Sequence, residues 1–309
     1  MNVSQVERRG RTATGRAEGQ ATGGGHGRAF YRRLESAQAW LLLLPILAAL
    51  LLLRIYPVVD AVVDSFKGPH GYGFANYTFL FGQSLFRQSL LTTLIFNAIV
   101  NPFQILVALA LAMLLTRKVA LRGLWRALIF APVAMPMPVD AVVWNQLLGQ
   151  KGPANGLLKA LGIPPQGFFT SGREALLSIV ILASWIGVGL WMVFLIAGIQ
   201  EIPTTLYDAA SVDGAGPFRR FWSVTLPLLR RPLAFVLVAD TVANLVLFAP
   251  VQIITTGGPL NATNLLMYSI FQQAYTNSAT NLAAAETLIM VVASLIVVVL
   301  EFRFLRPRA

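Results

Sequence analysis

Six long apolar stretches dominate the sequence and constrain its fold more than any other feature. Each holds about 20 or more mostly apolar residues, the length that an α-helix needs to cross a bilayer. The chain is 56% hydrophobic and 12% charged, with a mean hydropathy of +0.66. The sequence therefore predicts an all-α polytopic membrane protein with six transmembrane helices. The predicted spans cover residues 39–59, 90–115, 124–148, 175–199, 233–254 and 283–304.

Two of these stretches are interrupted by proline or polar residues. Such interruptions are tolerated in a membrane where the helix borders a cavity enclosed by protein. We therefore expect the third and fifth spans to face such a cavity. The interrupting residues are Pro132, Pro136, Pro138 and Asp140 in the third span and Asp240, Asn244 and Pro250 in the fifth.

Residues 1–37 differ in composition from the rest of the chain. They are rich in Gly, Thr, Ala and Arg and lack the apolar side chains that a folded core needs, which predicts a disordered basic tail. The following apolar run is too long for the core of a usual signal peptide. We expect residues 38–309 to form one transmembrane domain. The chain has no cysteine, and its two histidines lie in the tail and in a loop, so we expect no metal site.

Basic residues are distributed unevenly over the loops between the spans. With six spans, the tail, the second and fourth loops and the C-terminus share one side, and they carry most of the arginines. This asymmetry predicts both termini in the cytoplasm. It also accounts for the net charge of +11 without a nucleic-acid partner. The loop residues are Arg117, Lys118, Arg122 and Arg126 in the second loop and Arg219, Arg220, Arg230 and Arg231 in the fourth.

A polar segment, YDAASVDGAGPFRRFWSVTLPLL, separates the fourth and fifth spans on this predicted cytoplasmic side. Pro203 suits a helix start, residues 207–212 suit a helix of about two turns, and Gly214 and Gly216 suit its end. From the residues alone, two interpretations are open: a short docking helix, or an ordinary amphipathic loop within about residues 201–231.

The residue order in this segment resembles the EAA loop of permease subunits in binding-protein-dependent ABC importers. The matching run is Asp-Ala-Ala, then Asp-Gly-Ala, then Leu-Pro at positions 226 and 227. Glu is usual where this chain has Asp208, so the charge is kept and the reach is shorter. The resemblance implies a coupling helix that docks on an ATPase subunit. The residues implied are Tyr207, Asp208, Ala209, Ala210, Asp213, Gly214 and Ala215.

Three further stretches resemble sugar permeases of the same family, in the same order along the chain. They are residues 73–97, residues 122–148, and the turn TTGGP at 255–259 followed by Thr263. The pattern is similar to that of the larger permease of maltose transporters. The resemblance implies the ABC importer type I permease fold, a subunit of an ATP-driven sugar importer working by alternating access, and a multi-pass location in the bacterial cytoplasmic (inner) membrane.

Polar and aromatic residues in the fourth and fifth spans are candidate sugar contacts. Asp240 and Asn244 are four residues apart and share a helix face, and intramembrane polar groups mark solute pathways. Trp185 and Trp191 offer apolar faces to a sugar ring, and Gly187 allows close approach of a ligand or a neighbouring backbone. The alternatives are an interhelical hydrogen bond for Asp240 and a core or interfacial position for Trp191.

Alignment through the Ile-Pro string and the Gly-Gly-Pro turn extends the resemblance to the sugar site of the maltose permease. Two positions keep the residue type found there, Gly187 and Asn244, whereas Leu190 and Leu247 replace an aromatic residue and an amide, which implies a different sugar. Together with Trp185, the candidate substrate-binding residues are Ile186, Gly187, Leu190, Asp240, Asn244 and Leu247.

The sequence contains no G-x-x-x-x-G-K-[ST] loop for nucleotide phosphates. We therefore expect a transport subunit that is not itself an enzyme and holds no cofactor, with ATP and Mg on a separate ATPase chain. The resemblance implies a heterodimer with a second homologous permease, two ATPase copies, an extracytoplasmic solute-binding protein, a sugar substrate and membrane lipid as partners.

Other functions stay open from the sequence. The same transporter class could carry glycerol phosphate or another polyol derivative, although intramembrane cations are few. A secondary transporter or channel is disfavoured by the docking loop. An intramembrane aspartyl protease is disfavoured because no G-x-G-D follows the Tyr-Asp pair at 207–208.

Overall fold

The computed structural model describes residues 40–69, 71–117 and 119–305, so the predicted tail over residues 1–37 lies outside the described residues. The chain divides into two units, residues 1–59 and 60–309. In the first unit, residues 40–59 are helical and include the π-helical turn η1 (Leu51–Ile55). The helix continues without a break to the end of α2 (Tyr56–Ser65).

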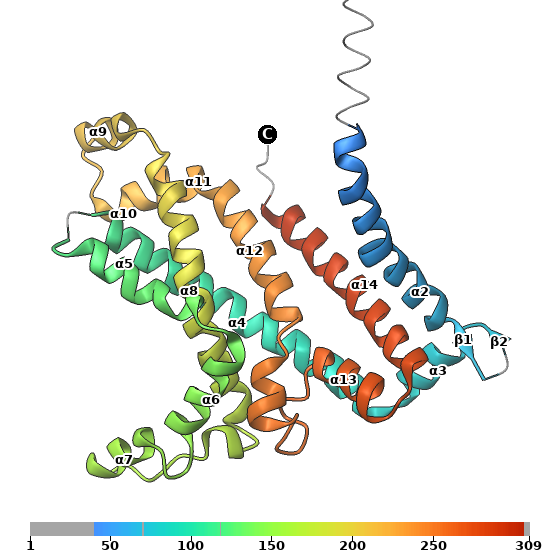
Figure 1. Ribbon diagram of the computed structural model, residues 1–309. Coiled ribbons are helices and arrows are strands. Elements are labelled where there is room, and N and C mark those ends of the chain that lie inside the picture. The colour runs from blue at the N-terminus through green and yellow to red at the C-terminus, as the bar shows by residue number, and fades with distance from the viewer. Residues whose placement is uncertain (1–39, 70, 118, 306–309) are drawn as a thin grey trace, which may run out of the picture. The chain divides into compact units, whose positions relative to one another are not determined.

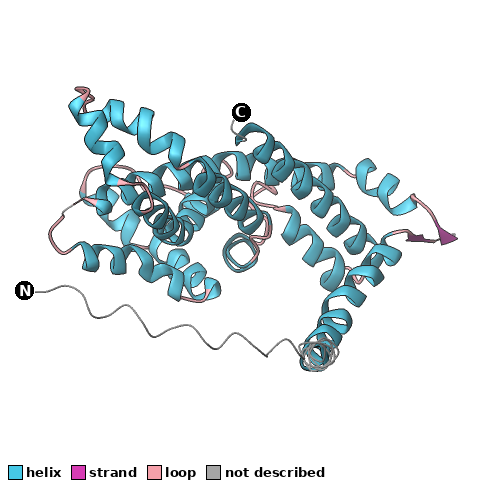
Figure 2. Ribbon diagram, turned by 90° about the horizontal axis from the view of Figure 1, so that it is seen from above, coloured by secondary structure: helices cyan, strands magenta, loops and turns pink. Residues whose placement is uncertain are grey.

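Helices dominate the second unit, as the all-α prediction requires (Figure 2). In the described residues, four helices are long and apolar enough to cross a membrane, and two bent pairs bring the number to six if each pair is one span. Each overlaps a predicted stretch. The four straight spans are Trp40–Ser65, Ser84–Thr116 (α4), Ala175–Gln200 (α8) and Thr280–Arg303, the last within α14 (Thr280–Leu305).

The third span is broken, as its prolines predicted. It consists of α5 (Arg122–Phe130), the 3₁₀ turn η2 (Ala131–Ala134), α6 (Met137–Leu148) and α7 (Pro153–Ala160), with a bend of 103° between its two halves. Pro136 has an extended ψ of 131° at the break. Proline also has no backbone N–H to continue a helical ladder, so the chain changes direction there.

The fifth span differs from its predicted bounds of 233–254. It begins earlier, with α10 (Pro217–Arg220), the π-helical turn η4 (Phe221–Thr225) and α11 (Leu226–Leu228), and bends by 68° into α12 (Arg230–Leu245). It also ends earlier, since η5 (Val251–Thr255) is a separate π-helical turn. Residues 246–248 are not helical, and the helix resumes at Ala249. Pro250 has no N–H to bond the carbonyl oxygen of Val246, which disfavours a continuous helix at this point.

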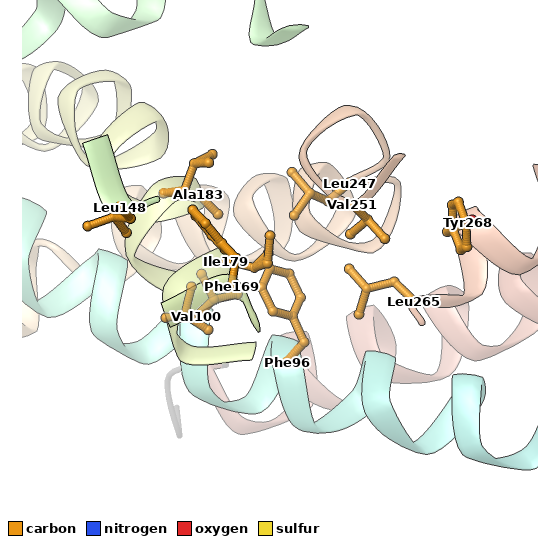
Figure 3. Close-up of a cluster of buried hydrophobic side chains, with 12 residues drawn as sticks. Phe96, Val100, Leu148, Phe169, Ile179, Ala183, Leu247, Val251, Leu265 and Tyr268 are labelled. Atoms are coloured by element: carbon orange, nitrogen blue, oxygen red, sulfur yellow. The ribbon is translucent and has the colours of Figure 1, made fainter. Parts of the chain in front are cut away.

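The most extensive packing in the second unit is between α4 and α8 (Figure 1). Gly187 on α8 permits this packing, since a Cβ there would lie 2.6 Å from Oε1 of Gln104 on α4. Gly189 permits a second close approach, to α5, because a Cβ there would overlap the carbonyl oxygen of Ile129. One hydrophobic cluster joins α4 and α8 to the segment after α12, where Leu247 and Val251 face Phe96 (Figure 3).

Shorter elements complete the second unit. Strands β1 (Lys67–Gly68) and β2 (Gly71–Tyr72) form an antiparallel pair with Lys67 opposite Tyr72, ahead of α3 (Ala75–Gly82). The 3₁₀ turn η3 (Phe168–Thr170) precedes α8, and α13 (Leu266–Phe271) and the π-helical turn η6 (Gln272–Thr276) precede α14. Another hydrophobic cluster packs α3 and α13 against α14.

The TTGGP stretch forms a closed turn between η5 and α13. Gly257 has a φ of +81°, which favours glycine, and the hydroxyl of Thr263 donates to the carbonyl oxygen of Gly258 and to Oγ1 of Thr255, each over 2.7 Å. The motif therefore returns the chain from η5 towards α13.

Candidate functional site

The predicted docking segment forms α9 (Thr204–Val212), a helix that begins directly after Pro203, where the sequence suits a helix start, and that includes the predicted residues 207–212. It lies at one end of the second unit, and α6 and α7 lie at the opposite end (Figure 1). None of its residues is buried within the chain. The segment is thus a projecting short helix, which favours the docking interpretation over an ordinary loop.

The end of α9 is fixed by a Schellman cap. Gly214 has a φ of +74°, its N–H donates to the carbonyl oxygen of Ser211 over 3.1 Å, and the N–H of Ala215 donates to that of Ala210 over 2.8 Å. Space around Gly214 is open, so its backbone conformation rather than crowding calls for glycine. The glycine-alanine pair of the motif thereby sets where the helix stops.

Side-chain hydrogen bonds hold α9 against the first half of the fifth span. The hydroxyl groups of Tyr207 and Thr225 lie 3.0 Å apart, and Nη1 of Arg220 donates to Oγ of Ser211 over 2.9 Å. These bonds join α9 to η4 and α10. The helix therefore has a defined attachment to the rest of the unit.

The outer surface of α9 is both acidic and apolar. Asp208, Ala209 and Asp213 are exposed, and Val212 is 88% exposed. An isolated exposed valine is ordinary, but here it lies on a projecting helix beside two carboxylates. Val212 was missed by the sequence reasoning, which concentrated on the polar positions of the motif.

Four helices meet at a buried polar network in the membrane-spanning part. The indole N–H of Trp191 on α8 donates to Oδ1 of Asp240 on α12 over 2.6 Å. The Asn244 amide donates to the same oxygen over 3.0 Å and to Oδ1 of Asn101 on α4 over 2.9 Å. Asp240 is 1% exposed and Asn244 is 5% exposed. In this conformation, therefore, the two predicted contacts on α12 bond to protein groups.

The network continues from α4 to α14. Asn101 donates to Oγ1 of Thr241 over 2.7 Å, and the Thr241 hydroxyl donates to Oε1 of Glu301 over 2.6 Å. Two buried atoms at its centre have no hydrogen-bond partner among the described residues: Oδ2 of Asp240 and Nε2 of Gln104. Oε2 of Glu301, at the α14 end of the network, also has no partner there, so the network retains two free carboxylate oxygens and one free amide nitrogen.

The other predicted sugar contacts do not gather around these two atoms. Gly187 packs against Gln104 of the network, but Leu247 is 3% exposed in the hydrophobic cluster of Figure 3. Ile186 and Leu190 are half-buried and pack against hydrophobic clusters. The seven residues are therefore split between polar network, hydrophobic core and surface.

Trp185 lies at a separate aromatic cavity of about 430 Å³ between α4, α5 and α8. It is 51% exposed, and its ring contacts that of Trp144 on α6 edge to face, with centroids 6.1 Å apart. Trp125, Phe103 and Ser184 also line this cavity. Its flat indole surfaces and single hydroxyl suit the apolar faces and the hydroxyl groups of a sugar ring.

Three polar residues of α4 in and beside the network were not predicted. Asn97, Asn101 and Gln104 are spaced by four and three residues in a long apolar span, so they share one helix face. That spacing is the signal that would have identified them. Glu301 has no comparable pattern around it. Within the described residues, no group of three His, Asp or Glu side chains is placed to hold a metal ion.

Comparison with known proteins identifies the family. A family model described as "Binding-protein-dependent transport system inner membrane component" matches residues 104–309. The chain is 31% identical over 238 residues to the sn-glycerol-3-phosphate transport system permease protein UgpA of Agrobacterium fabrum, covering 76% of this chain and 81% of that protein. It is 30% identical over 258 residues to the lactose transport system permease protein LacF of Rhizobium radiobacter, covering 80% and 87%.

Solved structures show the same fold. A chain of a bacterial alginate ABC transporter, crystallised with an alginate pentasaccharide-bound periplasmic protein, superposes with a TM-score of 0.81 at 20% identity, covering 90% of this chain and 97% of that one. A second alginate importer structure gives 0.78. The sequence matches and this fold together establish that the chain belongs to the family of inner-membrane permease components of binding-protein-dependent ABC transport systems.

Proposed function

We propose that this chain is the permease subunit of an ATP-driven carbohydrate importer, which docks a separate ATPase chain through α9. The observation that carries the proposal is α9 itself, an exposed and capped helix that bears two carboxylates and Val212. Its position follows the EAA-like motif of a chain whose family is established. The subunit performs no covalent chemistry, and ATP and Mg belong to the ATPase.

The contacts of α9 supply a route from the ATPase to the solute pathway. Closure of the ATPase dimer on ATP displaces α9, which is tied to η4 through Tyr207 and Thr225. The helix from α10 to α11 leads through the 68° bend into α12, which carries Asp240 and Asn244. Motion of the docking helix thus acts directly on the polar network, and the pathway alternates between its two openings.

Sugar contacts are proposed for the predicted set: Trp185, Ile186, Gly187, Leu190, Asp240, Asn244 and Leu247. The free Oδ2 of Asp240 supports this proposal, since a buried acceptor without a partner costs free energy that a sugar hydroxyl removes. Asp240 and Asn244 become accessible when α4, α8 and α12 separate. Leu247, packed in the core, has to move with the segment after α12.

Two solute classes have support. A neutral carbohydrate is favoured because the aromatic cavity is lined by no charged residue and the polar network contains carboxylates and amides but no cation. Glycerol phosphate is the second candidate, because several similar permeases are named for it. Identifying the ligand that co-purifies with the cognate solute-binding protein separates them, and a phosphomonoester there would overturn the carbohydrate assignment.

The proposed assembly pairs this chain with a second homologous permease, two ATPase copies and an extracytoplasmic solute-binding protein. Both termini, and with them α9, are placed on the cytoplasmic side of the inner membrane, on the basis of the arginine-rich loops. Reporter fusions at the C-terminus and near Asp213 test this orientation. A periplasmic signal at either position would reject it.

A substitution on α9 tests the docking function. Val212→Asp places a charge on the exposed surface of α9, and Leu260→Asp places the same charge at a residue 91% exposed in the turn before α13. Burial of a valine side chain contributes about 1.5–3 kcal/mol, so we expect Val212→Asp to weaken ATPase association at least tenfold. The measurement is ATPase recovered with the tagged complex from native membranes; equal recovery in both variants would remove α9 from the interface.

A further inference from the structure

A second cavity, of about 460 Å³, lies behind α9, where the ends of α4 and α8 meet α9, α10 and η4. It shares no lining residue with the aromatic cavity and none with the polar network, and Val212 is not among the residues that line it. Two arginines line it, Arg117 at the end of α4 and Arg220 at the end of α10, and no acidic residue does. A cavity with this lining favours an anion.

The arginines have donors available for such an anion. A guanidinium group has five N–H donors, and Arg220 gives one of them to Oγ of Ser211. That bond orients the side chain at the cavity edge. Arg117 is exposed and approaches from the opposite helix. The hydroxyls of Thr116, Tyr207 and Thr225 add polar groups between them.

The rest of the lining is apolar, which distinguishes this cavity from a site for a free inorganic ion. Met113, Ile199 and Phe221 supply hydrocarbon surface next to the two cations. The cavity begins where the apolar spans α4 and α8 end, the depth at which lipid headgroups lie. Trp222, beside this lining on η4, is 55% exposed, as is typical of a membrane interface.

We propose that this cavity binds the phosphate headgroup of an anionic phospholipid, with Arg117 and Arg220 on the phosphate and the apolar residues against the glycerol and upper acyl chains. Basic pockets between membrane helices on the cytoplasmic side bind such headgroups. The inference rests on the proposed cytoplasmic placement of α9. Because α4, α8, α9 and η4 all border the cavity, the bound lipid braces the attachment of the docking helix.

Lipid binding to the purified complex tests the site without requiring transport. Native mass spectrometry measures retention of phosphatidylglycerol and of phosphatidylethanolamine by the wild type, by Arg117→Gln/Arg220→Gln, and by Arg122→Gln/Arg219→Gln. The last variant removes two neighbouring cations that do not line the cavity. Each arginine should contribute as much binding free energy as one cation near an anionic membrane surface, so we expect Arg117→Gln/Arg220→Gln to lower the affinity for phosphatidylglycerol about 30-fold. The control pair should leave this affinity within about twofold of the wild type.

Two further measurements test whether the binding depends on the charge of the two arginines and on the lipid. Arg117→Lys/Arg220→Lys keeps both charges and should recover most of the affinity, which separates loss of charge from misfolding. Inorganic phosphate at equal concentration should not displace the lipid. Displacement by phosphate would assign the site to a free anion, and equal loss in both glutamine pairs would reject the cavity as the site. Binding in detergent is independent of orientation, so this failure is distinguishable from failure of the proposed topology.

Discussion

The indole N–H of Trp191 donates a 2.6 Å hydrogen bond to Oδ1 of Asp240, and this bond joins α8 to α12 across 49 residues of sequence. Both residues are almost fully buried, at 6% and 1% exposed. Asn244 donates to the same carboxylate oxygen and also reaches α4. Asp240, a predicted sugar contact, therefore links α12 to α8 directly and, through Asn244, takes part in the contact with α4.

Replacement of Trp191 by Phe keeps an aromatic ring and removes the donor to Asp240. A hydrogen bond to a charged or buried acceptor contributes about 1.5–3 kcal/mol, so we expect a lower thermal unfolding midpoint for the purified complex. Trp125→Phe is the matched control, because its indole is 50% exposed at the aromatic cavity. Equal midpoints for the two variants would show that the Trp191 bond adds nothing to stability.

The substitution Asp240→Asn tests whether this residue also contacts sugar. It preserves size, and loss of a charged hydrogen-bond acceptor is expected to raise the half-saturation for uptake about ten- to hundredfold at normal complex yield. Glu286→Gln, at another fully buried acid on α14, controls for general effects of removing a buried carboxylate. Reduced yield with unchanged half-saturation would assign Asp240 to helix packing alone.

Gly189 and Gly187 each allow a different neighbouring segment to approach α8 closely. Replacing them by alanine should therefore lower the stability of the protein by different amounts. A Cβ at 189 meets the backbone carbonyl of Ile129, whereas a Cβ at 187 meets the movable end of the Gln104 side chain. We expect Gly189→Ala to destabilise by about 1–3 kcal/mol and Gly187→Ala by less. The measurement is the thermal unfolding midpoint, and Gly156→Ala is the control because its Cβ enters open space. A lower midpoint for Gly187→Ala than for Gly189→Ala would contradict this packing of α8.

Gly214→Pro should uncouple ATP hydrolysis from uptake while the chain still inserts. Gly214 has a φ of +74°, whereas proline is fixed near −65°, so the cap of α9 cannot form. Gly216→Ala is the control, since Gly216 already has a φ of −65° and open space around it. ATPase stimulation by loaded binding protein, measured with uptake, reports coupling, and normal values of both in Gly214→Pro would exclude a role for the cap.

The sequence alone determined the features that depend on local composition. Apolar length located the four long helices and the general position of both bent pairs, because crossing a bilayer requires about 20 apolar residues wherever the helix packs. Proline positions predicted the break in the third span, and Gly214 predicted the end of α9, because backbone restrictions act within a few residues. The predicted end of the fifth span at residue 254 was wrong, since hydropathy continued past the true end of α12 at Leu245.

Only the tertiary structure decided which polar groups meet. Helical spacing placed Asp240 and Asn244 on one face, but their partners Trp191 and Asn101 lie 49 and 143 residues away. Those pairings depend on where α4, α8 and α12 cross, and the crossing depends on close approaches such as those of Gly187 to Gln104 on α4 and of Gly198 to Pro232 on α12. The arginine-lined cavity behind α9 arises in the same way, because α4, α8, α9, α10 and η4 all border it and no local sequence pattern predicts that they meet.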